Sequence, residues 1–193
     1  MVVHLPASGC ATTASLQELV DGWANAEEGM LVVQDVFTPE IATKVLPDKR
    51  AETVTRAAAE IILDLVQEKG NYVVTTDMGN EFRGLEAALP GGAVHRHRNA
   101  TTVVDRAIQT SKKDLAGMVA RRGGGWSEHV DEAAEAYNAR PHQAVTVAPE
   151  DVETSRGYVT VDLGNGRVQL PYRERPSAAE TTVYRELEIL VFL

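Results

Sequence analysis

Short apolar runs rich in β-branched residues alternate along this chain with longer segments whose apolar residues recur at helical spacing. The composition of the runs predicts strands at 16–21, 30–37, 41–46, 72–76 and 93–97. The helical spacing predicts helices at 51–69, 80–89, 101–120 and 127–139. This order predicts an α/β fold, in which a meander of three strands and two later strands form one mixed sheet flanked by helices.

The last forty or so residues have a different pattern. The stretch YVTVDLGNGRVQLPY predicts a hairpin that turns at Gly164, Asn165 and Gly166, and the terminal LEILVFL is an apolar strand without an evident partner. We therefore expect a core over 16–152 and a small, irregular C-terminal β appendage of unknown role over 153–193. Residues 1–15 are expected to be disordered or part of an incomplete module.

Bulk composition narrows the class of protein. The chain has 193 residues, 44% of them hydrophobic and 24% charged, which suits one globular domain with an appendage. No apolar run approaches the roughly 20 residues that span a bilayer, and the N-terminus lacks the basic start of a signal peptide. The single cysteine, Cys10, excludes an internal disulfide and a cysteine-based zinc cluster. These features predict a protein of the nucleus or cytoplasm that is neither secreted nor membrane-bound.

Charge is unevenly distributed along the chain. The net charge of −9 argues against a general nucleic-acid coat protein. Residues 94–122, however, contain seven Lys or Arg and only two acids, Asp105 and Asp114. A patch of this kind either binds phosphates or forms a solvated helix face, and charge alone does not decide between these two interpretations.

The stretch TTDMGNEF places Asp77 directly after the strand at 72–76 and before a glycine turn. Aspartate at such a position is commonly a turn or helix cap. It is also well placed to be a metal ligand, because α/β sheets bind ligands beyond the carboxyl ends of their strands.

Three aspartates, Asp21, Asp77 and Asp105, form a candidate ligand set. Two lie at the ends of predicted strands, and the third lies near the start of the long predicted helix. Converging carboxylates are what two-metal phosphoryl transfer requires, and their hard oxygens suit Mg²⁺ or Mn²⁺. On that helix, Asp105 shares a face with Gln109 and Lys112, and Arg106 and Lys113 flank it. The same pattern is also typical of an ordinary amphipathic surface helix.

Four segments resemble the catalytic core of retroviral and retrotransposon integrases, in the family's order: VVQDVFT, TTDMGNEF, NATTVVDRAIQTSKKDL and AEAYNARPHQAVTVAPEDV. The resemblance covers roughly residues 16–152. It implies a ribonuclease-H-like fold, DNA as the partner, and processing and joining of DNA 3′ ends with Mg²⁺ or Mn²⁺. It also implies DNA integration by a retrotransposon-derived protein that forms a homodimer or a larger homo-oligomer.

The resemblance assigns residues as well. The second catalytic acid falls on Asp77, the third on Asp105, and the DNA-contacting lysine region on Lys112 and Lys113. The first acid belongs to the strand before VVQDVFT, which favours Asp21 over the more conspicuous Asp35.

Three departures from the family pattern qualify the assignment. The third acid is Asp where the family usually has Glu, the 28 positions from Asp77 to Asp105 (105 − 77) are fewer than in the family, and no zinc-binding His/Cys module precedes the core. Two alternatives to an active integrase therefore stay open: an inactive relic that only binds nucleic acid, and a metal-dependent nuclease of the same fold.

Overall fold

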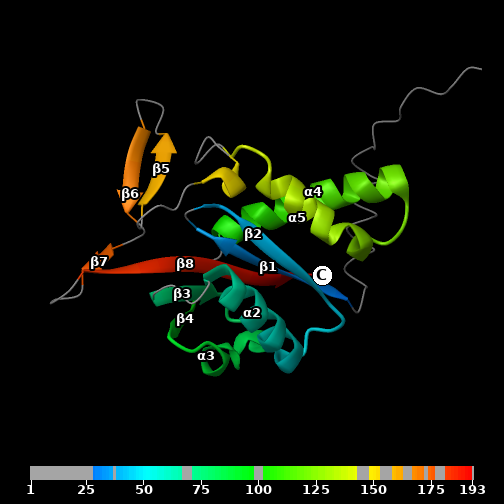
Figure 1. Ribbon diagram of the computed structural model, residues 1–193. Coiled ribbons are helices and arrows are strands. Elements are labelled where there is room, and N and C mark those ends of the chain that lie inside the picture. Colours follow the sequence, from blue (N-terminus) through cyan, green and yellow to red (C-terminus); the bar gives the residue numbers. More distant parts are fainter. Residues whose placement is uncertain are drawn as a thin grey trace, which may run out of the picture.

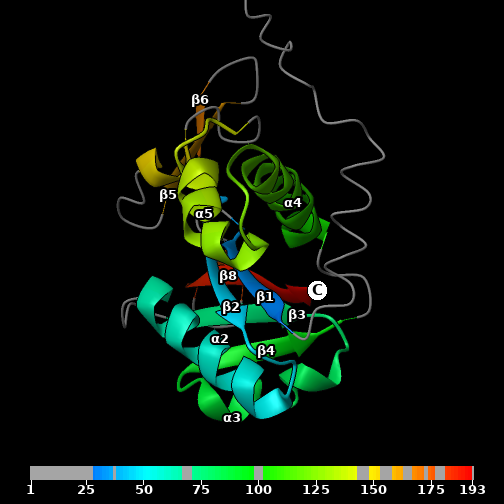
Figure 2. The ribbon, with the colours of Figure 1, turned by 90° about the vertical axis from the view of Figure 1, so that its right-hand side faces the viewer.

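One mixed β-sheet with helices on both faces forms the centre of the molecule (Figures 1 and 2). The computed structural model describes residues 28–36, 38–66, 71–97, 102–142, 148–152, 158–162, 167–171, 174–176 and 181–192. In spatial order the main strands are β2 (Ile41–Leu46), β1 (Gly29–Asp35), β8 (Thr181–Phe192), β3 (Asn71–Thr76) and β4 (Gly92–Arg96). A short sixth strand, β7 (Glu174–Pro176), pairs with the beginning of β8.

Strand directions make the sheet mixed, as the sequence predicts. β1 is antiparallel to both β2 and β8, whereas β3 is parallel to both β8 and β4. The carboxyl ends of β8, β3 and β4 therefore point toward the same edge of the sheet. The predicted five-stranded mixed sheet is confirmed, although one of its five strands comes from an unexpected part of the chain.

The helices divide between the two faces (Figure 2). α2 (Ala51–Val66) and the one-turn α3 (Leu85–Ala88) cover one face, and α4 (Thr102–Arg122) and α5 (Val130–Asn138) cover the other. Among the described residues, three 3₁₀ turns complete the helical segments: Asn80–Phe82, Trp126–His129 and Pro149–Asp151. The helices predicted at 51–69, 101–120 and 127–139 are therefore present, although residues 67–69 and 101 lie outside the described part of the chain. The one predicted at 80–89 is a 3₁₀ turn followed by α3.

Alternation along the strands explains the two hydrophobic layers. On β1, Leu31 and Val33 pack toward α2, and Met30 and Val32 pack toward α4 and α5. Successive side chains of a strand point to opposite faces, so a strand covered on both faces must be apolar throughout. This accounts for the uninterrupted apolar run at the start of β1.

The terminal strand has two partners where the sequence suggested none. β8 lies between β1 and β3, with Leu187 aligned with Asp35 on one side and with Val74 on the other. Leu187, Ile189 and Val191 are buried in the layer under α2. The C-terminal strand is thus central to the sheet. The strand predicted at 16–21 lies outside the described residues.

The predicted hairpin is present as β5 (Tyr158–Asp162) paired antiparallel with β6 (Arg167–Pro171), in a separate two-stranded sheet. Its predicted turn at Gly164, Asn165 and Gly166 lies outside the described residues. Among the helices that the structure describes, none combines the length and apolar character needed to cross a membrane.

Candidate metal and nucleic-acid site

Asp77 follows the last residue of β3, at the edge where parallel strands end. It is half-buried, and its Oδ1 accepts a hydrogen bond of 2.8 Å from the backbone N–H of Gly79. This is the Asx turn that one interpretation of the sequence predicts. A carboxylate has further lone pairs on both oxygens, so capping the turn with Oδ1 still allows it to bind a cation.

Gly79 in the turn after Asp77 has an ordinary backbone conformation, and the space beside it is filled by the Glu81 side chain. Gly79 has φ −53° and ψ 140°, a conformation open to any residue. The carboxyl group of Glu81 folds against it, since a Cβ at Gly79 would lie 2.5 Å from Glu81 Oε2. A second carboxylate, that of Glu81, is therefore held against the turn that begins at Asp77.

Asp105 lies in the first turn of α4 and is exposed. Only residues 97–101 separate the end of β4 from the start of α4, a span of at most roughly 20 Å. Because β4 and β3 are parallel, this connection starts at the edge of the sheet where Asp77 lies, and the bonds from Val103 and Val104 to Glu188 hold the first turn of α4 there. Asp77 and Asp105 thus belong to the same end of the molecule.

Glu188 on β8 ties the start of α4 to the sheet. Glu188 is 6% exposed, and its Oε2 accepts hydrogen bonds from the backbone N–H groups of Val103 (3.1 Å) and Val104 (3.0 Å). These are among the N–H groups that a helix leaves without internal partners. Glu188 also aligns with Thr75, two residues before Asp77. It therefore links the strand beside Asp77 to the helix that bears Asp105.

Glu188 was not among the residues singled out in the sequence, although a signal is present there. An acid inside the apolar run LEILVF must be buried with its neighbours, and a buried carboxylate needs hydrogen-bond donors. What the sequence does not give is the identity of the donors, which come from a helix that begins 86 positions earlier (188 − 102).

The structure describes only one of the two candidates for the first acid, Asp35. Asp21 lies outside the described residues. Asp35 is fully buried at the end of β1, where its Oδ1 accepts a bond of 3.3 Å from the N–H of Thr38 in the β1–β2 turn. By alternation with Val33 it belongs to the face under α2 and not to the face under α4. Asp35 thus stabilises the β1–β2 turn on the face opposite α4, and Asp21 remains the predicted first acid.

The polar face of α4 carries the predicted DNA-binding residues. Arg106, Gln109 and Lys113 are exposed, and Lys112 is half-buried. Burial lowers the pKa of Lys112, and the nearby positive charge of Lys49 lowers it further. The opposite stripe, formed by Val104, Ile108, Leu115 and Met118, is buried as predicted.

The YNARPH segment has a structural role. The Asn138 side chain clasps the backbone of the edge strand β2: its Oδ1 accepts from Ile41 N at 2.9 Å and its Nδ2 donates to Ile41 O at 2.8 Å. The buried Gln34 donates to the Tyr137 hydroxyl at 3.2 Å, and the His142 ring lies 4.3 Å from the Tyr137 ring between centroids. These contacts dock α5 on the β1–β2 hairpin, against the sheet that carries the site.

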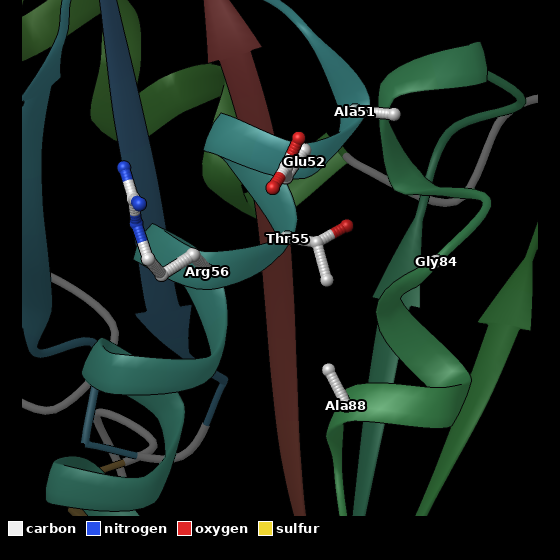
Figure 3. Close-up of a pocket in the computed structure, with 6 residues that line it drawn as sticks. All are labelled: Ala51, Glu52, Thr55, Arg56, Gly84 and Ala88. Atoms are coloured by element: carbon white, nitrogen blue, oxygen red, sulfur yellow. The ribbon is translucent and has the colours of Figure 1, made fainter.

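A shallow cavity on the other face is separate from these residues. Figure 3 shows it between α2 and α3, with the Thr55 side chain between the two helices. It is lined by Ala51, Glu52, Thr55, Arg56, Gly84 and Ala88. Because α2 and α3 cover the face opposite α4, this cavity does not belong to the candidate metal site.

The acids of the described part of the chain do not by themselves form a complete metal cluster. Within that part, no group of three or more His, Cys, Asp or Glu side chains lies close enough to hold a metal ion. The two described candidates, Asp77 and Asp105, supply the hard oxygen donors that Mg²⁺ and Mn²⁺ prefer. The donor chemistry therefore fits a divalent cation, and the predicted third ligand, Asp21, lies outside the described residues.

Comparison with known proteins supports the fold at the level of structure. No protein-family model matches the sequence, and no curated protein matches it. Among solved structures, the catalytic core domain of BIV integrase matches with a TM-score of 0.51 and 18% sequence identity. The match covers 63% of this chain and 82% of that domain. The chain therefore has the ribonuclease-H-like fold of an integrase catalytic core.

Proposed function

We propose that this protein is a divalent-metal-dependent polynucleotidyl transferase that processes DNA 3′ ends and joins them to other DNA. The observation that carries the proposal is the placement of Asp77 and Asp105 at one end of a sheet with the integrase-core fold. Asp21 is the expected third acid, and the four motifs quoted above support the same reaction.

The roles of the chain's own groups follow from their surroundings. Bound Mg²⁺ or Mn²⁺ would activate the attacking oxygen and stabilise the leaving oxygen of an in-line displacement at phosphorus. Asp77 would offer a carboxylate fixed by the Gly79 N–H, and Asp105 would offer an exposed one on a helix anchored through Val103 and Val104. Rigidly held ligands suit this chemistry, because a small displacement of a group that positions the reacting atoms strongly lowers the reaction rate.

The polar face of α4 would bind the DNA backbone. Arg106, Gln109, Lys112 and Lys113 lie along the helix from the turn that bears Asp105. A phosphate between Lys112 and Lys49 would relieve the repulsion that contributes to the lowered pKa of Lys112. Such contacts give affinity that does not depend on sequence and weakens with salt. We also propose, from the family resemblance alone, that the protein acts as a homodimer or a larger homo-oligomer.

One feature favours a second candidate function. Asp105 stands where the family usually has Glu, and its side chain is one methylene shorter than that of Glu. A ligand that reaches less far would weaken the metal site. The shorter ligand therefore favours one of two alternatives on the same fold: metal-dependent cleavage without joining, or DNA binding without catalysis.

The test is an end-joining assay with labelled DNA duplexes and Mn²⁺. Joined products support the transferase, cleavage alone supports a nuclease, and binding with neither product supports an inactive relic. Asp77→Asn and Asp105→Asn should each abolish any metal-dependent product. Asp64→Asn is the matched control, because Asp64 is exposed on α2 on the opposite face. Full activity in Asp77→Asn would refute the assignment of the site.

A further inference from the structure

The Arg96 side chain holds the turn that follows Asp77. Arg96 is the last residue of β4 and aligns with Thr76 on the neighbouring strand β3. Its Nη2 donates to two successive carbonyl oxygens, 2.8 Å to Met78 O and 2.6 Å to Gly79 O. One nitrogen thus fixes two consecutive backbone groups of this turn.

The carbonyl of Met78 and the N–H of Gly79 belong to the same peptide group. A peptide group is planar, so fixing its oxygen also fixes the direction of its N–H. That N–H is the donor to Asp77 Oδ1 at 2.8 Å. Arg96, the peptide group and the Asp77 carboxylate therefore form one continuous chain of hydrogen bonds.

Hydrogen bonds that are linked in this way strengthen one another. A charged donor on the carbonyl oxygen polarises the peptide group, and the N–H at its other side then binds an acceptor more strongly. Arg96 approaches from the face of the sheet that carries Thr76 and Val94, since aligned residues of parallel strands share a face. Thr75 and Glu188, next to the start of α4, lie on the other face. Arg96 thus acts on Asp77 through the backbone.

We infer that Arg96 is a positioning residue for Asp77: it sets the orientation of the carboxylate through the Met78–Gly79 peptide group and thereby sets the affinity for a divalent cation. This inference rests on the proposed function for its metal-binding consequence, but not for the hydrogen-bond chain itself. No residue assignment drawn from the sequence gives Arg96 a role. Loss of a group that orients a metal ligand typically lowers affinity about 10–100-fold.

The test compares Arg96→Met, which removes all donors, with Arg96→Gln, which keeps an amide donor, and with Arg83→Met. Arg83 is exposed and near the same turn, so its replacement makes the same change in charge without touching the Met78 and Gly79 carbonyls. Two quantities are measured in each folded variant: the affinity for Mn²⁺, followed by the electron paramagnetic resonance of the free ion, and the exchange rate of the Gly79 amide hydrogen without metal.

We expect Arg96→Met to weaken Mn²⁺ binding about tenfold or more, Arg96→Gln to weaken it less, and Arg83→Met to leave it within about twofold. The Gly79 amide should exchange faster in Arg96→Met than in Arg83→Met. Equal exchange rates, or equal Mn²⁺ affinities in a protein that binds the ion through Asp77, would overturn the inference. If Asp77→Asn binds Mn²⁺ as well as the unaltered protein does, the proposed function fails. The exchange rates then still decide whether Arg96 orients Asp77.

Discussion

Replacing Glu188 tests whether the C-terminal strand holds the helix that bears Asp105. Glu188 is 6% exposed, and its carboxylate accepts hydrogen bonds from two backbone N–H groups at the start of the 21-residue α4. In Glu188→Gln the amide oxygen still accepts these bonds, but the negative charge at the positive end of the helix dipole is lost. That change costs about 0.5–2 kcal/mol in partly buried sites.

Glu188→Ala removes the acceptor altogether. The buried N–H of Val104, left without a partner, costs about 1–3 kcal/mol. The N–H of Val103 adds less, because that residue is 37% exposed and water can accept the bond. We therefore expect the free energy of unfolding to fall in the order unaltered protein, Glu188→Gln, Glu188→Ala. For a chain of this size each kcal/mol lowers Tm by about 2–4 °C.

The assay is urea unfolding followed by circular dichroism, with Glu135→Gln and Glu135→Ala as matched controls. Glu135 is exposed on α5, and the same substitutions there should change the unfolding free energy by no more than about 0.5 kcal/mol. If Glu188→Ala unfolds at the same urea concentration as Glu135→Ala, then Glu188 does not hold α4, and the central position of β8 would be in doubt.

Three further predictions concern the frame around the site. Gly92→Ala should lower the unfolding free energy by about 1–3 kcal/mol, because a Cβ there would lie 2.3 Å from the Tyr72 ring. Thermal unfolding measures this loss, and an unchanged Tm would contradict the close packing of Gly92 against Tyr72. Asn138→Ala should cost about 1–3 kcal/mol in urea unfolding, because it removes both bonds to the Ile41 backbone, and a cost below about 0.5 kcal/mol would refute the clasp. Burial raises the pKa of Tyr137 above its ordinary value of 10.0, so the folded state keeps its proton where the unfolded state loses it, and stability should fall as pH rises above about 10. Tyr137→Phe should make this fall shallower in unfolding curves measured from pH 9 to 11.5, and an unchanged slope would contradict the assignment.

Most of the helices and strands could be predicted from the sequence because they depend on residues that are close together in the chain. The buried stripe of α4 and the apolar run of β1 follow from periods of 3.6 and 2 that any short window contains. The Asx turn at Asp77 likewise depends on neighbours two residues apart. For the same reason these features appear in the structure close to where the sequence placed them.

The position of β8 depends on long-range pairing, which no window of sequence contains. The run LEILVF has the composition of a doubly buried strand, but nothing in it specifies β1 and β3 as its partners. Glu188 and Arg96 were missed as contributors to the site for the same reason, since each acts on groups that are distant in sequence. Arg96 alone reaches across 17 and 18 positions to its two carbonyl acceptors.

The central claim is that Asp77 and Asp105 belong to one divalent-metal site, and a double-mutant cycle on Mn²⁺ affinity tests it most directly. Asp77→Asn, Asp105→Asn and the double variant are titrated beside Asp64→Asn. Ligands of one metal site are coupled. The loss of binding free energy in the double variant should therefore be much smaller than the sum of the two single losses, while Asp64→Asn binds Mn²⁺ normally. Additive losses, or normal affinity in either single variant, would show that the two carboxylates do not belong to one metal site.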